Sequence, residues 1–233
     1  MQAEQCIQSG VDEDSASYWD SDIEVSKRLE PLAPCHSYPP GIEISHQGSP
    51  TKNIYLIERG LVKLTRLEED GREIIIDLRF PRWMIGSASA VIHRPYSVTA
   101  MTLTRCELRR IPLEDFLHLV KTDSQFSWYL HQLHSQEVFQ HVARVAQLGC
   151  LSARQRLEEL LWQLICSLEL LDSQKEIKLD MPLKNWEVAA LIAVAPAYLS
   201  RLLNQMEDDN TIHRRNGWLV VPDPQKLWHW QGN

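Results

Sequence analysis

The pattern of hydrophobic and polar residues changes near residue 112, and the two halves of the chain predict different secondary structure. Between 42 and 111, short apolar runs alternate with polar residues and are separated by glycines or by Asp70-Gly71. Such runs predict strands, and Asp-Gly between two of them predicts a hairpin turn. Several short strands in succession indicate an antiparallel sandwich or barrel. Strands are expected at 54–57, 61–65, 73–78, 96–103 and 105–111.

The segment 124–148 contains neither proline nor glycine, and its apolar residues form one imperfect stripe, which predicts a single long helix. A long helix with a narrow apolar seam often pairs with a copy of itself. We therefore expect a homodimer built on this helix, the alternative being that the helix packs on its own domain. The stripe consists of Phe126, Leu130, Leu133, Val138, Val142, Val145 and Leu148.

Other elements follow from shorter patterns. Residues 1–16 are polar and acidic and are expected to be disordered, with a short helix at 18–29. A helix is expected at 113–120, and another at 152–171 with Ser152 as its N-cap.

The most specific pattern lies at 188–212, where two stretches of helical spacing flank the small residues 193–195 and Pro196. Proline is tolerated in the first turn of a helix, so the second helix is expected to begin near Pro196. Two helices joined by three or four residues form a helix-turn-helix, whose second helix enters the major groove of DNA. Asn216-Gly217 predicts a hairpin directly afterwards. Helix-turn-helix followed by a β-wing indicates a DNA-binding module; the alternative is a helical hairpin in a core.

Composition sets wider limits. The 233 residues fit one or two domains, and no apolar run of about 18 residues exists, so no membrane span is expected. The acidic start of the chain is unlike a signal or transit peptide. Five scattered cysteines are typical of reduced thiols, and we expect a cytoplasmic protein.

The charge is unusual for a DNA-binding protein. The formal net charge is −7, and after residue 150 we count 9 Lys and Arg against 11 Asp and Glu, a balance of −2. Because DNA is polyanionic, this negatively charged domain must gather its basic residues on the one surface that contacts DNA. We expect that face to contain Lys184, Arg201, His213, Arg214 and Arg215, with Glu207, Asp208 and Asp209 pointing away.

The order of these segments resembles the cyclic-AMP receptor/FNR (Crp/Fnr) family of bacterial transcription regulators. The resemblance rests on PPGIEISHQGSPTKNIYLIERGLVKLTRLEEDGREIIIDL and on LKNWEVAALIAVAPAYLSRLLNQMEDDNTI. It implies an α+β fold with an N-terminal antiparallel β-roll, a long dimerisation helix and a C-terminal winged helix-turn-helix. It also implies double-stranded DNA, a second copy of the chain and RNA polymerase as partners. The expected divisions are 1–30, an acidic tail with a short helix; 31–120, the β-roll; 121–150, the dimerisation helix; and 151–233, the DNA-binding domain.

The segment IGSASAVIHRPYSVTA departs from the cyclic-nucleotide binders of this family. Those proteins place a Glu after a Gly, for the ribose, and an Arg-Ser pair, for the cyclic phosphate. Here Ser87 follows Gly86, and Tyr96-Ser97 stands in place of Arg-Ser. A buried phosphate needs a charged partner, and tyrosine offers one neutral hydroxyl. We therefore expect no cyclic-nucleotide binding, with Arg94 as the residue that would substitute if a phosphate were bound.

No resident cofactor, metal site or enzymatic activity is expected. An iron–sulfur cluster needs four converging thiolates, and only Cys6 and Cys35 lie N-terminal. His93 falls at the haem-ligand position of the family's CO sensors, and whether it ligates haem stays open. His134 and His141 would need further ligands to hold zinc. We find no nucleophile–base pairing or phosphate loop.

The recognition helix also departs from the family pattern, because Pro196-Ala197 lacks the glutamate that accepts from cytosine N4. The resemblance implies that Arg201 reads guanine, since its forked donors fit O6 and N7. Tyr198 either contacts DNA or packs on the turn. The candidate base or phosphate contacts are Tyr198, Ser200, Asn204 and Gln205, and the candidate phosphate contacts are Lys184, Arg214 and Arg215.

These features predict a homodimeric, sequence-specific DNA-binding regulator of transcription. The alternative is a ligand-binding or protein-interaction member of the family with weak DNA affinity, which the acidic C-terminal domain and the missing glutamate favour.

Overall fold

The computed structural model describes residues 29–30, 32–168, 176–215 and 217–227. The expected disorder at 1–16 and nearly all of the helix expected at 18–29 lie outside the described residues. The chain divides into two compact units, and the division falls between Ala143 and Arg144, inside one long helix.

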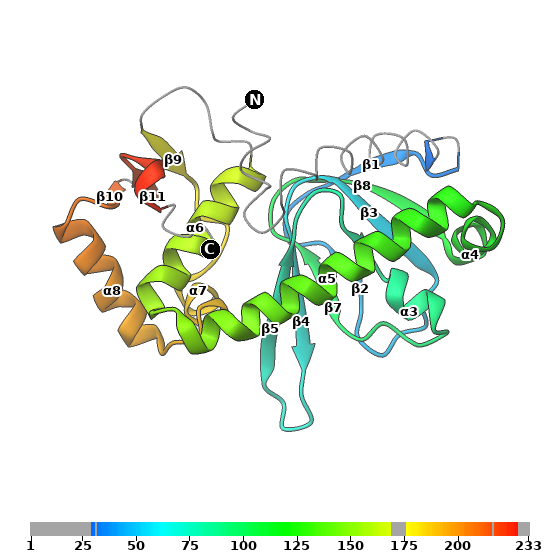
Figure 1. Ribbon diagram of the computed structural model, residues 1–233, viewed down its shortest axis with the longest axis horizontal. Helices are drawn as coiled ribbons and strands as arrows, with labels where there is room; N and C mark the ends of the chain where they lie inside the picture. The colour runs from blue at the N-terminus through cyan, green and yellow to red at the C-terminus, as the bar shows by residue number, and fades with distance from the viewer. Residues whose placement is uncertain (1–28, 31, 169–175, 216, 228–233) are drawn as a thin grey trace. The chain divides into compact units, whose positions relative to one another are not determined.

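The first unit is built on two antiparallel four-stranded sheets, so the expected antiparallel β-roll is confirmed (Figure 1). The strand orders are β1-β8-β3-β6 and β2-β7-β4-β5. The strands are β1 (Cys35–Tyr38), β2 (Glu43–Ser45), β3 (Asn53–Arg59), β4 (Val62–Leu67), β5 (Glu73–Arg79), β6 (Met84–Ile85), β7 (Thr99–Thr102) and β8 (Cys106–Pro112).

The five expected strands correspond to β3, β4, β5, β7 and β8, and Gly71, with a φ of 81°, lies in the expected β4–β5 turn. Strands β1, β2 and β6 were not expected. Each has only two to four residues, which is too short for an alternating pattern to appear in the sequence.

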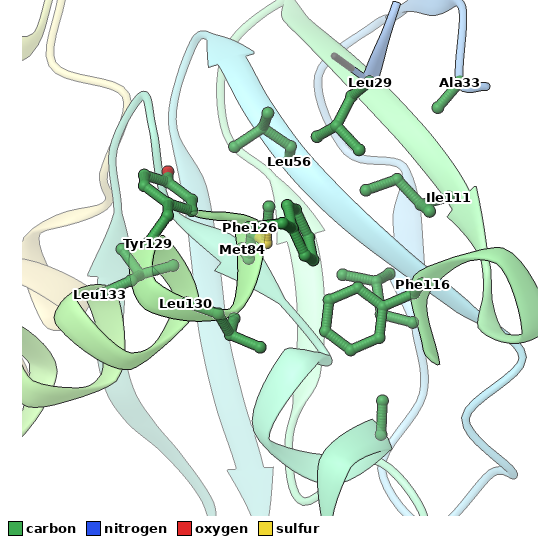
Figure 2. Close-up of a cluster of buried hydrophobic side chains, with 12 residues drawn as sticks. Leu29, Ala33, Leu56, Met84, Ile111, Phe116, Phe126, Tyr129, Leu130 and Leu133 are labelled. Carbon is green, nitrogen blue, oxygen red and sulfur yellow. The ribbon is translucent and has the colours of Figure 1, made fainter. Parts of the chain in front are cut away.

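In the described part of this unit the helices are α3 (Ser87–Val91), α4 (Leu113–Thr122) and the portion of α5 (Ser124–Cys150) up to Ala143. The first half of α5 closes the hydrophobic core, where Phe116 of α4 meets Phe126 of α5 edge to face at 5.8 Å. Figure 2 shows Phe126, Tyr129, Leu130 and Leu133 projecting from this helix into the same cluster as Leu56, Met84 and Ile111.

This packing corrects the expected dimer stripe. Phe126, Leu130 and Leu133 are at most 6% exposed and belong to the core of their own unit. They therefore do not form a seam with a second copy. The apolar residues of the second half are exposed instead, namely Val138, Phe139, Val142, Val145 and Leu148. The sequence stripe merged two different faces of one helix.

The second unit contains the expected winged helix-turn-helix. Its elements are α6 (Ala153–Ser167), β9 (Ile177–Leu179), α7 (Asn185–Leu191), α8 (Pro196–Asp208), β10 (His213–Arg215), β11 (Trp218–Val221) and the short helix η2 (Pro224–Leu227). The strands form one antiparallel sheet in the order β10-β11-β9. Ser152 caps α6 as expected, in a reciprocal capping box with Gln155. Helix α8 begins at Pro196, as expected.

Helices α7 and α8 meet at a bend of 95°, within the range of helix-turn-helix units. Across the described ranges no single helix has the length and apolar content of a membrane span; only this bent pair, taken together, reaches them. Cys35, Cys106 and Cys150, among the described residues, are free thiols.

Candidate DNA-reading face and effector-pocket region

One face of α8 is buried and the other is open to solvent. Its leucines and its methionine supply the buried face, because they recur at spacings of three and four residues. The exposed face therefore carries the polar residues between them. The buried residues are Leu199, Leu202, Leu203 and Met206, and the exposed candidates for DNA contact are Tyr198, Ser200, Arg201, Asn204 and Gln205.

The guanidinium of Arg201 lies over the ring of Tyr198, with 5.4 Å between the guanidinium carbon and the ring centroid. The two residues are three apart on α8 and therefore neighbours on its surface. A cation–π contact of this kind does not use the N–H groups of the guanidinium as hydrogen-bond donors to a side chain, so they can still donate to a base. Tyr198 is 44% exposed, so it lies on the open face beside Arg201. Ser200, by contrast, donates its hydroxyl hydrogen to the Pro196 carbonyl at 3.2 Å.

Arg214 of β10 does not stand free. Its backbone amide donates to Oε1 of Glu207 at 2.8 Å, its Nε to Oε2 at 2.9 Å, and its Nη2 to Oδ1 of Asn204 at 2.6 Å. Glu207 was expected to point away from the basic face, and that expectation is wrong. The chain returns from α8 into β10 after only four residues, 209–212, which brings Arg214 beside the last turn of the helix. The hydrogen bonds from Arg214 lower the pKa of Glu207.

A second ion pair holds the end of α8. Arg154 of α6 donates to Asp209, to Glu158 at 2.8 Å and to Thr211 Oγ1 at 2.9 Å. The hydrogen bond from Arg154 is the main cause that lowers the pKa of Asp209 to about 2. Arg156 donates to the Ile192 carbonyl at 2.9 Å, at the C-terminal end of α7.

The remaining cations of the expected face are exposed. Lys184 is exposed at the start of α7, where its backbone amide donates to the Glu187 carboxylate at 2.8 Å. Arg215 is exposed at the end of β10, and His213 is half-buried at its start. The free positive charge on this face comes mainly from Lys184, Arg201 and Arg215.

In the expected effector region, Tyr96 fills the position where the resemblance places an arginine. Its side chain is buried, its hydroxyl donates to the Asn53 carbonyl at 2.5 Å, and the Asn53 amide donates back at 3.3 Å. Burial is the main cause that raises the pKa of Tyr96. Gly86, with a φ of 88°, lies against this ring, since a Cβ there would be 2.8 Å from Cε1 of Tyr96. Glycine is required at position 86 for both reasons.

Ser87 is also buried and already has partners. Its Oγ lies 3.0 Å from Nε2 of His134 on α5 and 3.5 Å from the Met84 carbonyl. Burial lowers the pKa of His134, so the neutral imidazole is favoured. Tyr96 is buried, whereas three other candidates of this region are exposed, namely His93, Arg94 and Ser97. Among the described residues there is no cluster of three or more metal-ligating side chains.

One buried cation near this region has no signal in the sequence. Arg79, at the end of β5, forms ion pairs with Asp77 and with Glu137 of α5, and its guanidinium lies 4.8 Å from the ring centroid of Trp83. Glu137 also lies 3.8 Å from Nε2 of His141. Together with Ser87 and His134, these pairs tie α5 to the sheet side of the first unit by polar contacts.

Two protein-family models match the chain, one over the β-sheet unit and one over the helix-turn-helix. Residues 35–123 match the cyclic nucleotide-binding domain, and residues 155–230 match the Crp-like helix-turn-helix domain. The chain belongs to the Crp/Fnr family.

Individual relatives of this Crp/Fnr protein are distant. The chain is 20% identical to the cAMP-activated global transcriptional regulator CRP of Haemophilus influenzae, over 80% of this chain and 83% of the relative. It is 25% identical to the global nitrogen regulator of a Synechocystis species, over 77% of this chain and 80% of the relative. Among solved structures it resembles CLP, a c-di-GMP-responsive global regulator of Xanthomonas campestris, with a TM-score of 0.69 and 20% identity over 85% of this chain and 98% of that one.

FixK2 of Bradyrhizobium japonicum has the same TM-score of 0.69, at 19% identity over 84% of this chain and 96% of that one. These likenesses show the fold, and the family comparison shows a DNA-binding transcription regulator. Ser87 and Tyr96 stand at the positions where the family resemblance places a glutamate and an arginine.

Proposed function

We propose that this protein is a homodimeric, sequence-specific regulator of transcription that binds DNA through α8 and does not respond to cyclic nucleotides. The exposed polar face of α8 carries the first part of the proposal. It presents Arg201, Asn204 and Gln205 on one side of a helix whose other side is buried. A recognition helix needs this division, because base edges are read by side chains that are free to enter the major groove.

Self-association is supported by the second half of α5. Val138, Val142 and Val145 are 61%, 63% and 71% exposed in the single chain. Their spacing of four and three residues is that of a coiled-coil seam, and His131, Ser135 and Gly149 continue the same spacing. A contiguous apolar stripe of this kind marks an association site in a soluble protein. A two-fold dimer would present two α8 helices to the half-sites of a near-palindromic operator.

Indifference to cyclic nucleotides is supported by the buried contacts around Gly86. The hydroxyl of Tyr96 is committed to Asn53, and the hydroxyl of Ser87 to His134. Neither side chain carries a positive charge for a phosphate, and Arg94 is exposed. RNA polymerase, as the partner of a transcription regulator, and a cytoplasmic location belong to the same proposal.

A second candidate is a family member with weak DNA affinity that acts through a ligand or another protein. The pairing of Arg214 with Glu207 favours it, because it removes one positive charge from the expected basic face. The two candidates differ in a measurable way: only the first requires selection of one DNA sequence over others.

The test is selection of binding sites from random duplex DNA by the full-length protein, followed by titration of the enriched site. The proposal expects a near-palindromic sequence bound by a dimer. Arg201→Ala should impair selection, whereas Lys178→Ala, which removes an exposed cation from β9, should not. Enrichment of no sequence at all would favour the second candidate. Calorimetry with cyclic AMP should give no heat of binding, and micromolar binding would contradict that part of the proposal.

A further inference from the structure

Asn204 and Arg214 form a contact between the recognition helix and the wing that bears on how bases are read. Asn204 lies on the exposed face of α8, and its Oδ1 accepts from Nη2 of Arg214 at 2.6 Å. Arg214 is itself held by Glu207, which accepts from its backbone amide and its Nε. Three residues from two elements therefore share one hydrogen-bonded cluster, which we call the α8–wing clasp.

The chemistry of arginine fixes the orientation of the Asn204 amide. A guanidinium has only donors, so the amide atom that faces it has to be the oxygen. The Nδ2 group, with its two N–H donors, is then directed away from the guanidinium. In an isolated asparagine the two orientations are close in energy, but here one of them would place N–H against N–H.

This orientation limits the bases that Asn204 can recognise. The usual contact of asparagine with adenine is bidentate: Nδ2 donates to N7 while Oδ1 accepts from the N6 amino group. An oxygen that already accepts a charge-assisted bond from Arg214 is a weak and crowded acceptor for that amino group. An adenine placed there would leave its amino group without a good partner, which is unfavourable. Guanine O6 and N7 and thymine O4 offer acceptors alone, which suits the free Nδ2 donors.

We propose that Arg214 sets base specificity through Asn204: the α8–wing clasp restricts Asn204 to donating, so that it reads guanine or thymine and disfavours adenine. Arg214 is in this view a positioning residue and not a phosphate contact. Glu207 holds it there by accepting three further hydrogen bonds, from the backbone amide, Nε and Nη2 of Arg214. The inference rests on the proposed function, in which α8 reads DNA.

The experiment repeats the selection from random duplex DNA with wild-type protein, Arg214→Met, Arg214→Lys and Asn204→Ala. Arg214→Met frees Oδ1 and should raise the relative affinity for adenine at one position of each half-site by about tenfold, the discrimination typical of one such contact. Arg214→Lys keeps the charge but lacks the fork that bonds Glu207 and Asn204 together, so it should shift the preference in the same direction. Asn204→Ala should abolish the preference at that position, and adding Arg214→Met to it should have no further effect there.

Arg215→Met is the matched control, because Arg215 is the adjacent, exposed arginine of the same strand. It should weaken all sequences alike and leave every base preference unchanged. Circular dichroism of each variant should show that the winged unit stays folded.

Three results would count against the inference. A uniform loss of affinity for Arg214→Met, with a salt dependence reduced by about one phosphate contact and rescue by Arg214→Lys, would make Arg214 a phosphate contact. An unchanged base preference in Arg214→Met would exclude its action through Asn204. Both results leave the proposed function standing, provided that wild-type protein selects a sequence. A wild-type protein that selects none would overturn the proposed function and this inference with it.

Discussion

Ser87 Oγ and His134 Nε2 lie 3.0 Å apart, and this contact joins the start of α3 to the long helix α5. Burial is the largest cause that lowers the pKa of His134. Glu137 opposes that shift, and His131 adds to it. The neutral form of this half-buried histidine is therefore favoured next to the buried Ser87, at the position where the family resemblance places the glutamate for the ribose.

The stability of the first unit should depend on this histidine. Because the native state disfavours protonated His134, the unfolded chain binds more protons once the pH falls below about 6.5, the ordinary histidine pKa. The contribution of neutral His134 is complete above that pH and is lost as the pH falls from there towards the lowered native value. Urea denaturation of wild-type protein should show this loss, and His134→Gln should make the profile flatter. His118→Gln, at an exposed histidine of α4, should leave the profile unchanged; an unchanged profile in His134→Gln would refute the prediction.

The two halves of α5 should respond differently to substitution. Val145→Glu places a charge in the exposed seam and should shift the protein from dimer to monomer, because an unpaired charge at an apolar interface is costly. Light scattering at micromolar concentration measures this shift. Gln140→Glu, which adds the same charge at another exposed position of α5, is the control. A monomeric wild type would contradict the proposed dimer.

Leu133→Ala should act on folding instead of association. The side chain is 6% exposed within its own unit, and leucine-to-alanine changes at buried sites cost about 2–5 kcal/mol in unfolding free energy. Urea denaturation should show the loss, while the mass of the folded fraction stays that of wild type. A folded but monomeric Leu133→Ala would return Leu133 to the seam.

Arg201→Ala should relax base preference at one position of each half-site, at a cost of about 1–3 kcal/mol in discrimination. Arg215→Ala should weaken all sites alike and flatten the salt dependence. Tyr198→Ala removes the ring under the Arg201 guanidinium and should produce a weaker form of the Arg201→Ala effect, since the stacked arginine loses its support. Binding titrations on a set of single-base operator variants separate these results. Uniform weakening by Arg201→Ala would show that it contacts phosphate.

Tyr96→Phe should destabilise the first unit by about 1 kcal/mol, the usual value of one buried hydrogen bond, because the Asn53 backbone loses its partner. Thermal or urea denaturation measures the change. Calorimetry should detect cyclic AMP binding neither before nor after the substitution, because phenylalanine adds no positive charge. Binding of cyclic AMP by wild-type protein would implicate Arg94 as the phosphate partner.

Elements with a clear period were predictable from the sequence, and side-chain partnerships were not. Pro196 marked the start of α8, and Ser152 marked the start of α6, because both residues act through the backbone of their own helix. The burial of Leu133 beside the exposure of Val138 was not predictable, since one apolar stripe on a helix does not say which neighbour covers it.

The ion pairs, like the burial of individual side chains, were not predictable from the sequence. The sequence indicated how many cations follow residue 150, but not that Arg154 and Arg214 are held by Asp209 and Glu207. Those pairs form between residues that lie on separate elements or across a turn, so only the folded chain brings them together. Arg79 with Glu137, 58 residues apart, gave no signal at all.

The apolar core of the first unit forms within one chain, because Phe126, Leu130 and Leu133 pack there. Its formation therefore does not require a second copy. Obligate dimers lack a stable folded monomer, and their folding depends on protein concentration. Here a subunit separated from the proposed dimer would keep its core while the valine seam of α5 became exposed. Assembly would then be a reversible equilibrium between folded partners, and the amount of protein made would itself regulate how much of it can occupy a two-fold operator.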